Sequence, residues 1–398
     1  MIATNCLRAG GLYPTYETTR FVSDETYRTW FRGHPKPGDI IFVTKGSPGR
    51  VCLAPDPVDF CIAQDMVAIR ADESKVYPRY LFAVLRSQGA QQRIENMHVG
   101  TLIPHFKKGD FDKLLLPIPD PASQREIGDL YFELSSRIDL LQRMNTTLEA
   151  IAQALFKSWF VDFDPVRAKV EGREPEGVQP ELAALFPSEF EDSALGEIPK
   201  GWRVGTLIDI AILNPESWTA KNPPATVSYI DLANTKDNVV ADVAEYAFDE
   251  APSRARRVLR DGDTIVGTVR PGNRSFAYIQ KPPSNLTAST GFAVLRPSNA
   301  QNTEFLYLAA TQDSSIEHLA HVADGAAYPA VRPEVVSGIQ CVIPSGDIMR
   351  AFHDVAAPLL STISVNQRQG QILATLRDTL LPQLMSGKVR ITQQGAAL

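Results

Sequence analysis

The chain has 398 residues, a formal net charge of −6 and a hydrophobic content of 44%. A chain of this length holds more than one hydrophobic core. Its acidic balance excludes a protein that binds nucleic acid through overall positive charge. The four cysteines form no Cys-x-x-Cys pair, which excludes a disulfide or zinc framework and indicates reduced cytosolic thiols. With no signal-peptide pattern at the start and no apolar stretch of membrane-spanning length, we expect a cytoplasmic protein.

The acidic excess is local. Residues 161–200 carry ten Asp or Glu and four Lys or Arg, which accounts for the whole net charge of −6. Contact with DNA would therefore rest on local basic clusters, with partner proteins neutralising further phosphates.

Residues 1–118 have an α+β pattern that ends where a long helical segment begins. β-branched and apolar runs predict strands, apolar residues at helical spacing predict a helix, and glycine with proline marks turns. On these signals we expect strands over 39–44, 66–70 and 114–118, a turn over 45–49, a helix over 78–92 and a loop over 100–108.

Residues 119–160 predict one long helix. From Ile127 to Trp159 apolar residues recur at alternating spacings of four and three, with Asn145 in the same series. Such a heptad seam packs along a second helix. Forty residues of helix are roughly 60 Å long, so this element is a spacer rather than part of a globular core.

The rest of the chain mirrors this plan. Proline, glycine and acidic residues dominate 161–200, which predicts an extended connector with at most one short helix and no core of its own. A second globular part, 201–345, carries strand patterns over 227–231, 263–266 and 292–296, a helix beginning near Phe305 and a loop over 326–332. A second long helix lies within 346–388, and 389–398 is a loose tail.

The chain contains an internal repeat. A shift of 225 residues places Ile118-Pro119 on Ile343-Pro344, Gly100 on Gly325, Leu134 on Leu359 and Leu155 on Leu380. Further upstream the shift changes by one, and Gly38-Asp39 falls on Gly262-Asp263. A register kept over more than fifty residues indicates a tandem duplication of a globular part followed by a long helix. By this register the first copy lacks roughly the opening 25 to 30 residues of the second.

Several stretches resemble one family. Leu148 to Val166, Leu195 to Trp202 and Leu380 to Lys388 are similar to conserved motifs of the specificity (S) subunits of type I restriction-modification systems. The resemblance implies two target-recognition domains, 1–118 and 201–345, separated by two antiparallel helices that form a coiled coil. Each domain would read one half of a bipartite site in double-stranded DNA.

The resemblance also implies partners. Two methyltransferase (M) subunits would bind the helices and restriction (R) subunits would join them, methylating adenine or cleaving DNA. S-adenosylmethionine, ATP and Mg²⁺ would serve those partners, and this chain would hold no cofactor, no metal and no catalytic residue.

Candidate DNA-binding residues lie in turns that match between the copies. Arg pairs commonly with guanine and Asn with adenine, whereas Lys mostly holds phosphate. The first copy offers Lys45, Ser47, Arg50, His105, Lys107 and Lys108, and the second offers Arg270, Asn273, Arg274, Tyr328 and Arg332. The competing interpretation of each cluster is an ordinary solvated basic loop.

Enzymatic motifs are incomplete. Asn222-Pro223-Pro224 approaches an amino-methyltransferase motif, but Ala225 stands where that chemistry needs an aromatic ring to stack the base. Residues Gly46–Gly49 lack the Gly-Lys-Ser/Thr ending of a phosphate-binding loop. The alternative to a DNA-recognition subunit is a coiled-coil protein-interaction scaffold without DNA specificity.

Overall fold

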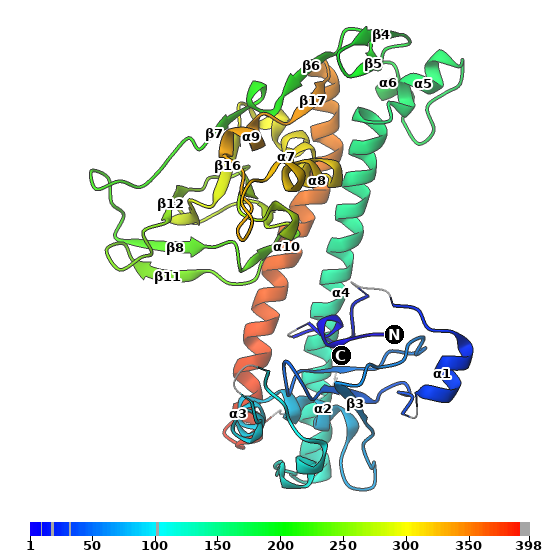
Figure 1. Ribbon diagram of the computed structural model, residues 1–398, viewed down its shortest axis with the longest axis vertical. Helices are drawn as coiled ribbons and strands as arrows, with labels where there is room; N and C mark the ends of the chain where they lie inside the picture. Colours follow the sequence, from blue (N-terminus) through cyan, green and yellow to red (C-terminus); the bar gives the residue numbers. More distant parts are fainter. Residues whose placement is uncertain (9, 17–19, 32, 101–102, 391–398) are drawn as a thin grey trace, which may run out of the picture. The chain divides into compact units, whose positions relative to one another are not determined.

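A computed structural model describes residues 1–8, 10–16, 20–31, 33–100 and 103–390 (Figure 1). The protein is α+β, as predicted, and divides into two units. Unit 1 comprises residues 1–144 and 366–398, and unit 2 comprises residues 145–365. Both units contain part of the two long helices, α4 (Pro121–Phe160) and α10 (Gly346–Met385). None of the described helices is long and apolar enough to span a membrane.

Unit 1 is built on a three-stranded antiparallel sheet in the order β2-β1-β3. All four residues of the central strand β1 are buried, because it is covered on both faces. The elements outside the long helices are η1 (Thr4–Cys6), α1 (Asp24–Trp30), β1 (Ile40–Val43), β2 (Val51–Leu53), β3 (Met66–Ile69), α2 (Pro78–Arg86), α3 (Gln88–Met97) and η2 (Lys108–Lys113).

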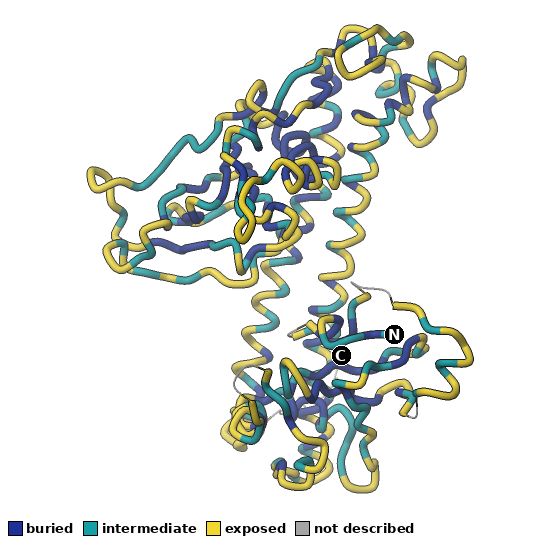
Figure 2. Tube along the Cα trace, in the orientation of Figure 1, coloured by how far each residue is buried: buried dark blue, intermediate teal, exposed yellow. Residues whose placement is uncertain are grey.

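The core of unit 1 joins the sheet to both long helices. Phe42 of the sheet, Phe82 of α2, Tyr131 of α4 and Leu381 of α10 belong to one buried cluster. Figure 2 shows this interior in dark blue, with exposed residues in the loops and on the outward faces of the helices. Helix α2 lies unusually close to α4 at Gly128, where a Cβ atom would stand 2.6 Å from the backbone nitrogen of Tyr80.

Unit 2 contains two four-stranded sheets, with strand orders β11-β8-β15-β12 and β14-β13-β16-β7. The first sheet combines antiparallel pairs with a parallel β8–β15 pair. These strands are β7 (Ala211–Leu213), β8 (Thr226–Ile230), β11 (Ala244–Ala247), β12 (Ala255–Val258), β13 (Thr264–Gly267), β14 (Phe276–Tyr278), β15 (Leu286–Ser289) and β16 (Phe292–Pro297).

Short hairpins and helices complete unit 2. Strands β6 and β17 pair antiparallel, as do β9 with β10 and β4 with β5. The elements are α5 (Asp164–Val170), α6 (Pro180–Ala183), β4 (Phe190–Ser193), β5 (Gly196–Pro199), β6 (Arg203–Thr206), η3 (Leu207–Asp209), β9 (Thr235–Lys236), β10 (Val239–Val240), η4 (Pro271–Asn273), η5 (Ala300–Asn302), α7 (Thr303–Thr311), α8 (Asp313–Val322), α9 (Pro333–Ser337) and β17 (Gln340–Ile343).

The long helices run antiparallel within each unit. In unit 2, Asn145 of α4 donates to the carbonyl oxygen of Ile363, and Phe156 contacts Phe352. The residue number rises along α4 from Asn145 to Phe156, while that of the contacted residue on α10 falls from Ile363 to Phe352, so the two helices are antiparallel. In unit 1, Arg377 of α10 lies over the ring of Tyr131 and contacts Ser135 of α4.

The prediction for residues 161–200 was wrong in one respect. This segment forms two short helices and a hairpin, and it contributes Phe163, Val166, Phe186 and Ile198 to the core of unit 2. Its composition is that of an extended linker, but these few apolar side chains find a hydrophobic surface that only the folded unit provides.

Two local predictions in unit 1 also need correction. The helix expected over 78–92 is two helices broken at Ser87, whose extended backbone ends α2 while its hydroxyl caps α3 at Ala90. Residues 114–118 form no strand, and Leu115 is 75% exposed. Their counterpart β17 pairs with β6, whereas no described strand of unit 1 pairs with this segment.

Candidate nucleic-acid interface

The turn between β1 and β2 in unit 1 is held by backbone hydrogen bonds. Gly46 and Gly49 have φ angles of 87° and 88°, which glycine adopts without strain. The Gly46 nitrogen donates to the carbonyl oxygen of Pro104 at 2.9 Å, and Gly49 donates to Val43 at 3.0 Å. This geometry leaves Lys45 exposed and Ser47 half-buried.

The loop around His105 is fastened to this turn. His105 forms backbone bridges with both Val99 and Lys45, and the buried Phe106 donates its N–H to Thr44 at 2.7 Å. Lys107 and Lys108 follow at the start of η2 and are exposed. The expected loop 100–108 therefore stands beside the turn 44–50, except for Thr101 and Leu102, which lie outside the described residues.

Unit 2 repeats the same arrangement with different side chains. Ala330 forms backbone bridges with both Asp324 and Val269, and the Arg270 nitrogen donates to Pro329 at 2.6 Å. Val331 donates to Thr268 at 2.9 Å, as Phe106 does to Thr44. We call residues 44–50 with 99–100 and 103–107, and residues 268–274 with 324–332, the loop pairs of units 1 and 2.

The exposed tip of the unit 2 loop pair is an arginine stacked on an aromatic ring. The guanidinium carbon of Arg270 lies 4.7 Å from the ring centre of Tyr328, and Arg270 Nη2 donates to Ala327. Tyr328 is 71% exposed, and Asn273 and Arg332 nearby are exposed too. Stacking and the hydrogen bond fix the direction of a side chain that still has N–H groups to offer a base or phosphate.

Two predicted contact residues are already bound within the protein. Arg274 Nε lies 2.5 Å from Asp237, and its Nη1 lies 2.8 Å from Asp313. Burial lowers the pKa of Arg274, but the two carboxylates outweigh it, so the net shift is upward. Its counterpart Arg50 donates to the carbonyl oxygen of Leu7 at 3.0 Å. Both arginines hold the loop pairs in place.

The residues that point outward differ between the units. By the backbone match, Gly46 corresponds to Arg270, Ile103 to Tyr328 and Lys107 to Arg332. Ile103, which was not singled out in the sequence, is exposed. Only the repeat register identifies it, because a lone isoleucine in a loop has no chemical signature.

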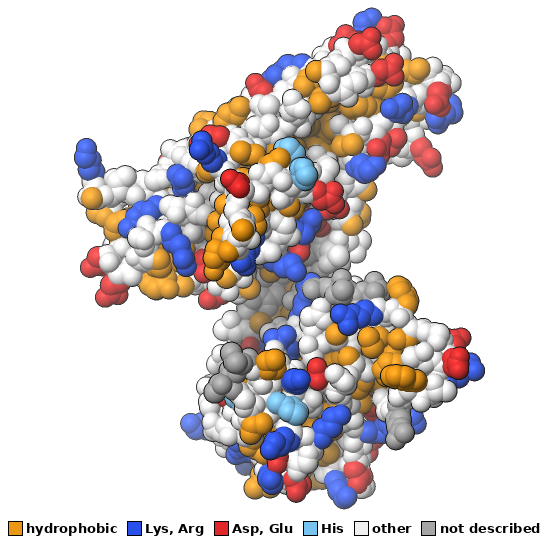
Figure 3. All heavy atoms as spheres, viewed as in Figure 1, with side chains coloured by type: hydrophobic (Ala, Val, Ile, Leu, Met, Phe, Trp, Pro, Cys, Tyr) orange, Lys and Arg blue, Asp and Glu red, His pale blue; other side chains and the backbone are white. Residues whose placement is uncertain are grey.

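Charge at the surface is dispersed. The face shown in Figure 3 mixes Lys and Arg with acidic and uncharged side chains in both units. The arginines of the run from Arg254 to Arg260 bind other side chains of unit 2. Arg254 donates to Tyr229, Arg256 stacks on Phe248, and Arg260 forms an ion pair with Glu216. Among the described residues, no cluster of three His, Cys, Asp or Glu could hold a metal ion.

Comparison with known proteins identifies the relatives of this chain. A family model for the type I restriction modification DNA specificity domain matches residues 1–150. The type I restriction enzyme HindI specificity subunit of Haemophilus influenzae is 27% identical, over 89% of this chain and 87% of that protein. The MjaIX specificity subunit of Methanocaldococcus jannaschii is 24% identical, over 89% of this chain and 78% of that protein.

A solved structure has a similar fold. The S subunit of a type I restriction-modification system from M. genitalium matches with a TM-score of 0.54 and 17% identity, over 98% of this chain and 92% of the other.

Proposed function

We propose that this chain is a specificity subunit of a type I restriction-modification system, and that its two loop pairs read the two halves of a bipartite DNA site. It directs adenine methylation or cleavage by partner subunits and carries no catalytic site of its own. The observation that supports this assignment is the loop pair itself, since one backbone arrangement occurs in both units with different side chains at the tip.

Shared backbone and divergent tips suit two half-sites. A common scaffold presents each loop pair to a duplex in the same way, and the side chains at the tips select the bases. In unit 2 the preoriented Arg270 suits guanine, whose O6 and N7 accept two hydrogen bonds, and Asn273 suits adenine. Lys45, Lys107 and Lys108 in unit 1 suit phosphates.

Partners supply the chemistry in this proposal. Two M subunits bind one copy of this chain, R subunits complete the complex, and these partners use S-adenosylmethionine, ATP and Mg²⁺. Apolar side chains on the outer faces of the long helices remain available for such partners, namely Leu140, Ile372 and Leu376 in unit 1 and Ile151, Val355 and Val365 in unit 2.

The test is a map of methylated adenines in cells that express this chain with its M subunit. We expect Arg270→Ala to relax or abolish recognition of one half-site only, by about 1–3 kcal/mol per lost base contact. Lys45→Ala with Lys107→Ala should weaken methylation without changing which bases are preferred, because phosphate contacts carry no sequence information.

Tyr328→Phe provides the matched control for the stacked arginine, since it keeps the ring and removes only the hydroxyl. Tyr328→Ala should resemble Arg270→Ala. The assignment of the loop pairs would be contradicted if Arg270→Ala or Tyr328→Ala removed the base preference at both half-sites. It would also be contradicted if neither variant changed the preference at either half-site.

A further inference from the structure

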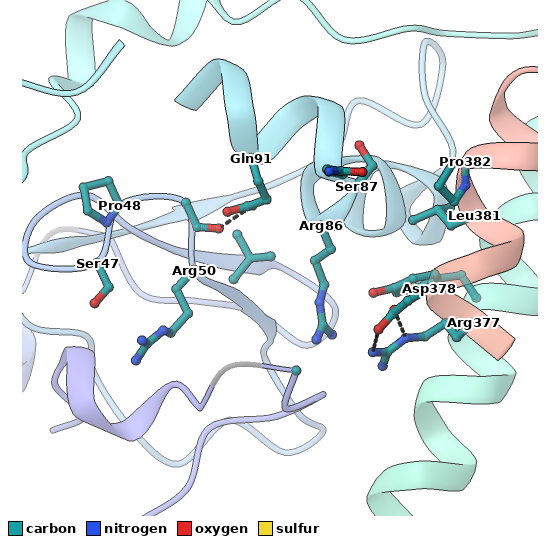
Figure 4. A pocket seen from close by; sticks show the side chains of 15 residues that line it. Ser47, Pro48, Arg50, Arg86, Ser87, Gln91, Arg377, Asp378, Leu381 and Pro382 are labelled. Atoms are coloured by element: carbon teal, nitrogen blue, oxygen red, sulfur yellow. Dashed lines mark hydrogen bonds and ion pairs between the residues drawn. The ribbon is translucent and has the colours of Figure 1, made fainter. Parts of the chain in front are cut away.

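A cavity of about 580 Å³ lies within unit 1, behind the turn of its loop pair (Figure 4). Its walls are the turn from Ser47 to Val51, the junction of α2 with α3, and the last turns of α10. Three arginines and one carboxylate line it, namely Arg50, Arg86, Arg377 and Asp378. The lining therefore has an excess of positive charge.

Arg86 is a largely buried cation with few partners. Its guanidinium lies 5.1 Å from the ring centre of Phe82 and 5.8 Å from that of Tyr131. The hydrogen bond it makes is a long one, 3.5 Å to the carbonyl oxygen of Gly11, and no described carboxylate forms an ion pair with it. Five N–H donors are thus left almost unused. Burial lowers the pKa of Arg86, and the positive charge of Arg377 adds to this effect.

The acid in the cavity is already engaged. Arg377 is 7% exposed, and it donates from Nε and Nη2 to the two carboxylate oxygens of Asp378, at 2.8 and 3.1 Å. Figure 4 shows this pair beyond Arg86, with Arg50 on the turn at the other side. Arg86 and Arg50 therefore have no acid of their own in the cavity, while both open on the same space.

The repeat shows that the fold does not need these charges. At the shift of 225, Arg86 corresponds to Thr311, Tyr131 to Ala356 and Arg377 to Ala152. All three counterparts are fully buried in unit 2, and the two alanines belong to its apolar core. Unit 2 thus packs its helices with small uncharged residues at the positions where unit 1 has two arginines and a tyrosine.

We propose that this cavity is a phosphate-binding site in which Arg86 and Arg50 hold the anion and Arg377 supports it. A guanidinium matches two phosphate oxygens with parallel N–H groups, and a partly enclosed site strengthens the attraction. Ser47 on the turn supplies a further hydroxyl donor, whereas the amide nitrogen of Gln91 on α3 is taken up by the carbonyl oxygens of Gly49 and Leu85. The phosphate comes either from the DNA backbone, because the turn that forms one wall also carries Lys45, or from a free phosphate-bearing molecule.

The first experiment uses pyrophosphate as the probe, titrated calorimetrically into the chain in complex with its M subunit at constant ionic strength set with NaCl. We expect saturable binding to the wild type and to Arg28→Gln, which removes an exposed arginine elsewhere in unit 1. Arg86→Gln should bind at least tenfold more weakly. Thermal melting without pyrophosphate checks that each variant is folded.

Two variants cover the case in which Arg86→Gln does not fold. Arg86→Lys keeps a cation over the two rings but loses the planar fork. Arg50→Gln leaves the buried cluster intact and removes the hydrogen bond from Arg50 to the carbonyl oxygen of Leu7. Both should weaken pyrophosphate binding several-fold. The inference is wrong if the wild type shows no binding, or if the folded variants bind pyrophosphate as tightly as the wild type.

The second experiment identifies the source of the phosphate and rests on the proposed function. DNA duplexes contain the recognition site identified by the map of methylated adenines. In each duplex a neutral methylphosphonate replaces one backbone phosphate. If a DNA phosphate enters the cavity, a methylphosphonate at one position should weaken DNA binding by the wild type about tenfold. The same substitution should leave DNA binding by Arg86→Gln unchanged. If pyrophosphate binds but no methylphosphonate position weakens DNA binding in this way, the ligand of the cavity is a free phosphate-bearing molecule. Should the loop pairs fail to select half-sites, the pyrophosphate result still stands, so the two proposals fail separately.

Discussion

Asp39 and Asp263 show how single residues fix the same fold twice. Each aspartate accepts a bidentate pair from an arginine, Arg70 in unit 1 and Arg296 in unit 2, at distances of 2.6 to 2.9 Å. Each also accepts a backbone N–H three residues earlier, at 2.7 Å. These acids thus anchor both the turn before the central strand and the strand that pairs beside it.

Replacing either aspartate should lower the free energy of unfolding, and replacing Asp263 should lower it more. In Asp263→Ala the guanidinium of Arg296 keeps only Glu216, and the turn loses an acceptor, so we expect a loss of about 3–5 kcal/mol in unfolding free energy. Asp39→Ala should cost less, because Arg70 is exposed and finds water. Urea denaturation of the two variants tests the ranking, and an equal small loss in both would contradict it.

Glu149 is a buried carboxylate on α4 within unit 2. The hydroxyl of Tyr307 donates to it at 2.5 Å and the amide of Asn238 at 3.1 Å. Burial raises the pKa of Glu149, and the hydrogen bonds from Tyr307 and Asn238 oppose that shift only in part. The folded state therefore binds a proton more tightly than the unfolded state does.

The sign of the pH dependence follows by linkage. A raised folded pKa contributes stability that is complete below the unfolded pKa of about 4.3 and is lost as the pH rises through the folded value. We expect Glu149→Gln to gain stability relative to the wild type as the pH rises above the unfolded pKa of about 4.3. Melting temperatures across that range measure it, with exposed Glu317→Gln as the control. A difference that does not vary with pH would contradict this.

Among the elements, the loop pairs owe their shape to the backbone. The bridges at His105 and Ala330 and the hydrogen bonds of Gly46 and Arg270 involve main-chain atoms. Side chains at the tips can therefore change without loss of the loop conformation. This separation explains how one scaffold carries Gly46 in one unit and Arg270, at a φ of 48°, in the other.

The contact between α2 and α4 depends on the absence of a side chain at Gly128. In Gly128→Ala the new Cβ would lie 2.6 Å from Tyr80 N, so α2 must shift, and we expect unit 1 to lose about 1–3 kcal/mol. Gly370→Ala on α10 is the matched control, since open space surrounds its Cβ. That variant should gain about 0.5–1 kcal/mol, because alanine favours a helix. Thermal unfolding compares the two, and a neutral Gly128→Ala would refute the close approach.

At the scale of the whole molecule, α4 and α10 each connect the two units covalently. Both are 40 residues long, and each passes from one unit to the other near its middle, at 144–145 and 365–366. If these helices set the gap between half-sites, their length determines that gap and the loop pairs determine the bases.

Inserting one heptad at each of these two points tests the idea. The heptad keeps the apolar seam in phase and adds roughly 10 Å of helix. We expect the half-site sequences to stay the same and the gap to widen by about three base pairs. The added base pairs also rotate one half-site by about a third of a turn, so methylation should be weaker. Strong methylation in the methylome at sites with the original gap between half-sites would show that the helices do not set that gap.

The sequence by itself determined the long helices, the α+β class and the duplication. Helix α4 was predicted over its full length because its heptad spacing is a local property. The loop pairs were located by comparing the copies, which needs no knowledge of contacts. The resemblance to specificity subunits rests on motifs at the ends of the long helices and in the connector, which are local in the sequence.

Only the tertiary structure decided which polar groups are free to bind a ligand. Arg274 and Arg270 look alike in the sequence, but the partners of Arg274 lie 37 and 39 residues away, and they hold it inside the protein. The cavity of unit 1 likewise joins Arg50, Arg86 and Arg377, which are brought together by packing of the sheet, α2 and α10. Burial of Phe186 from an acidic connector has the same origin. Such contacts depend on long-range packing, which local spacing and composition do not encode.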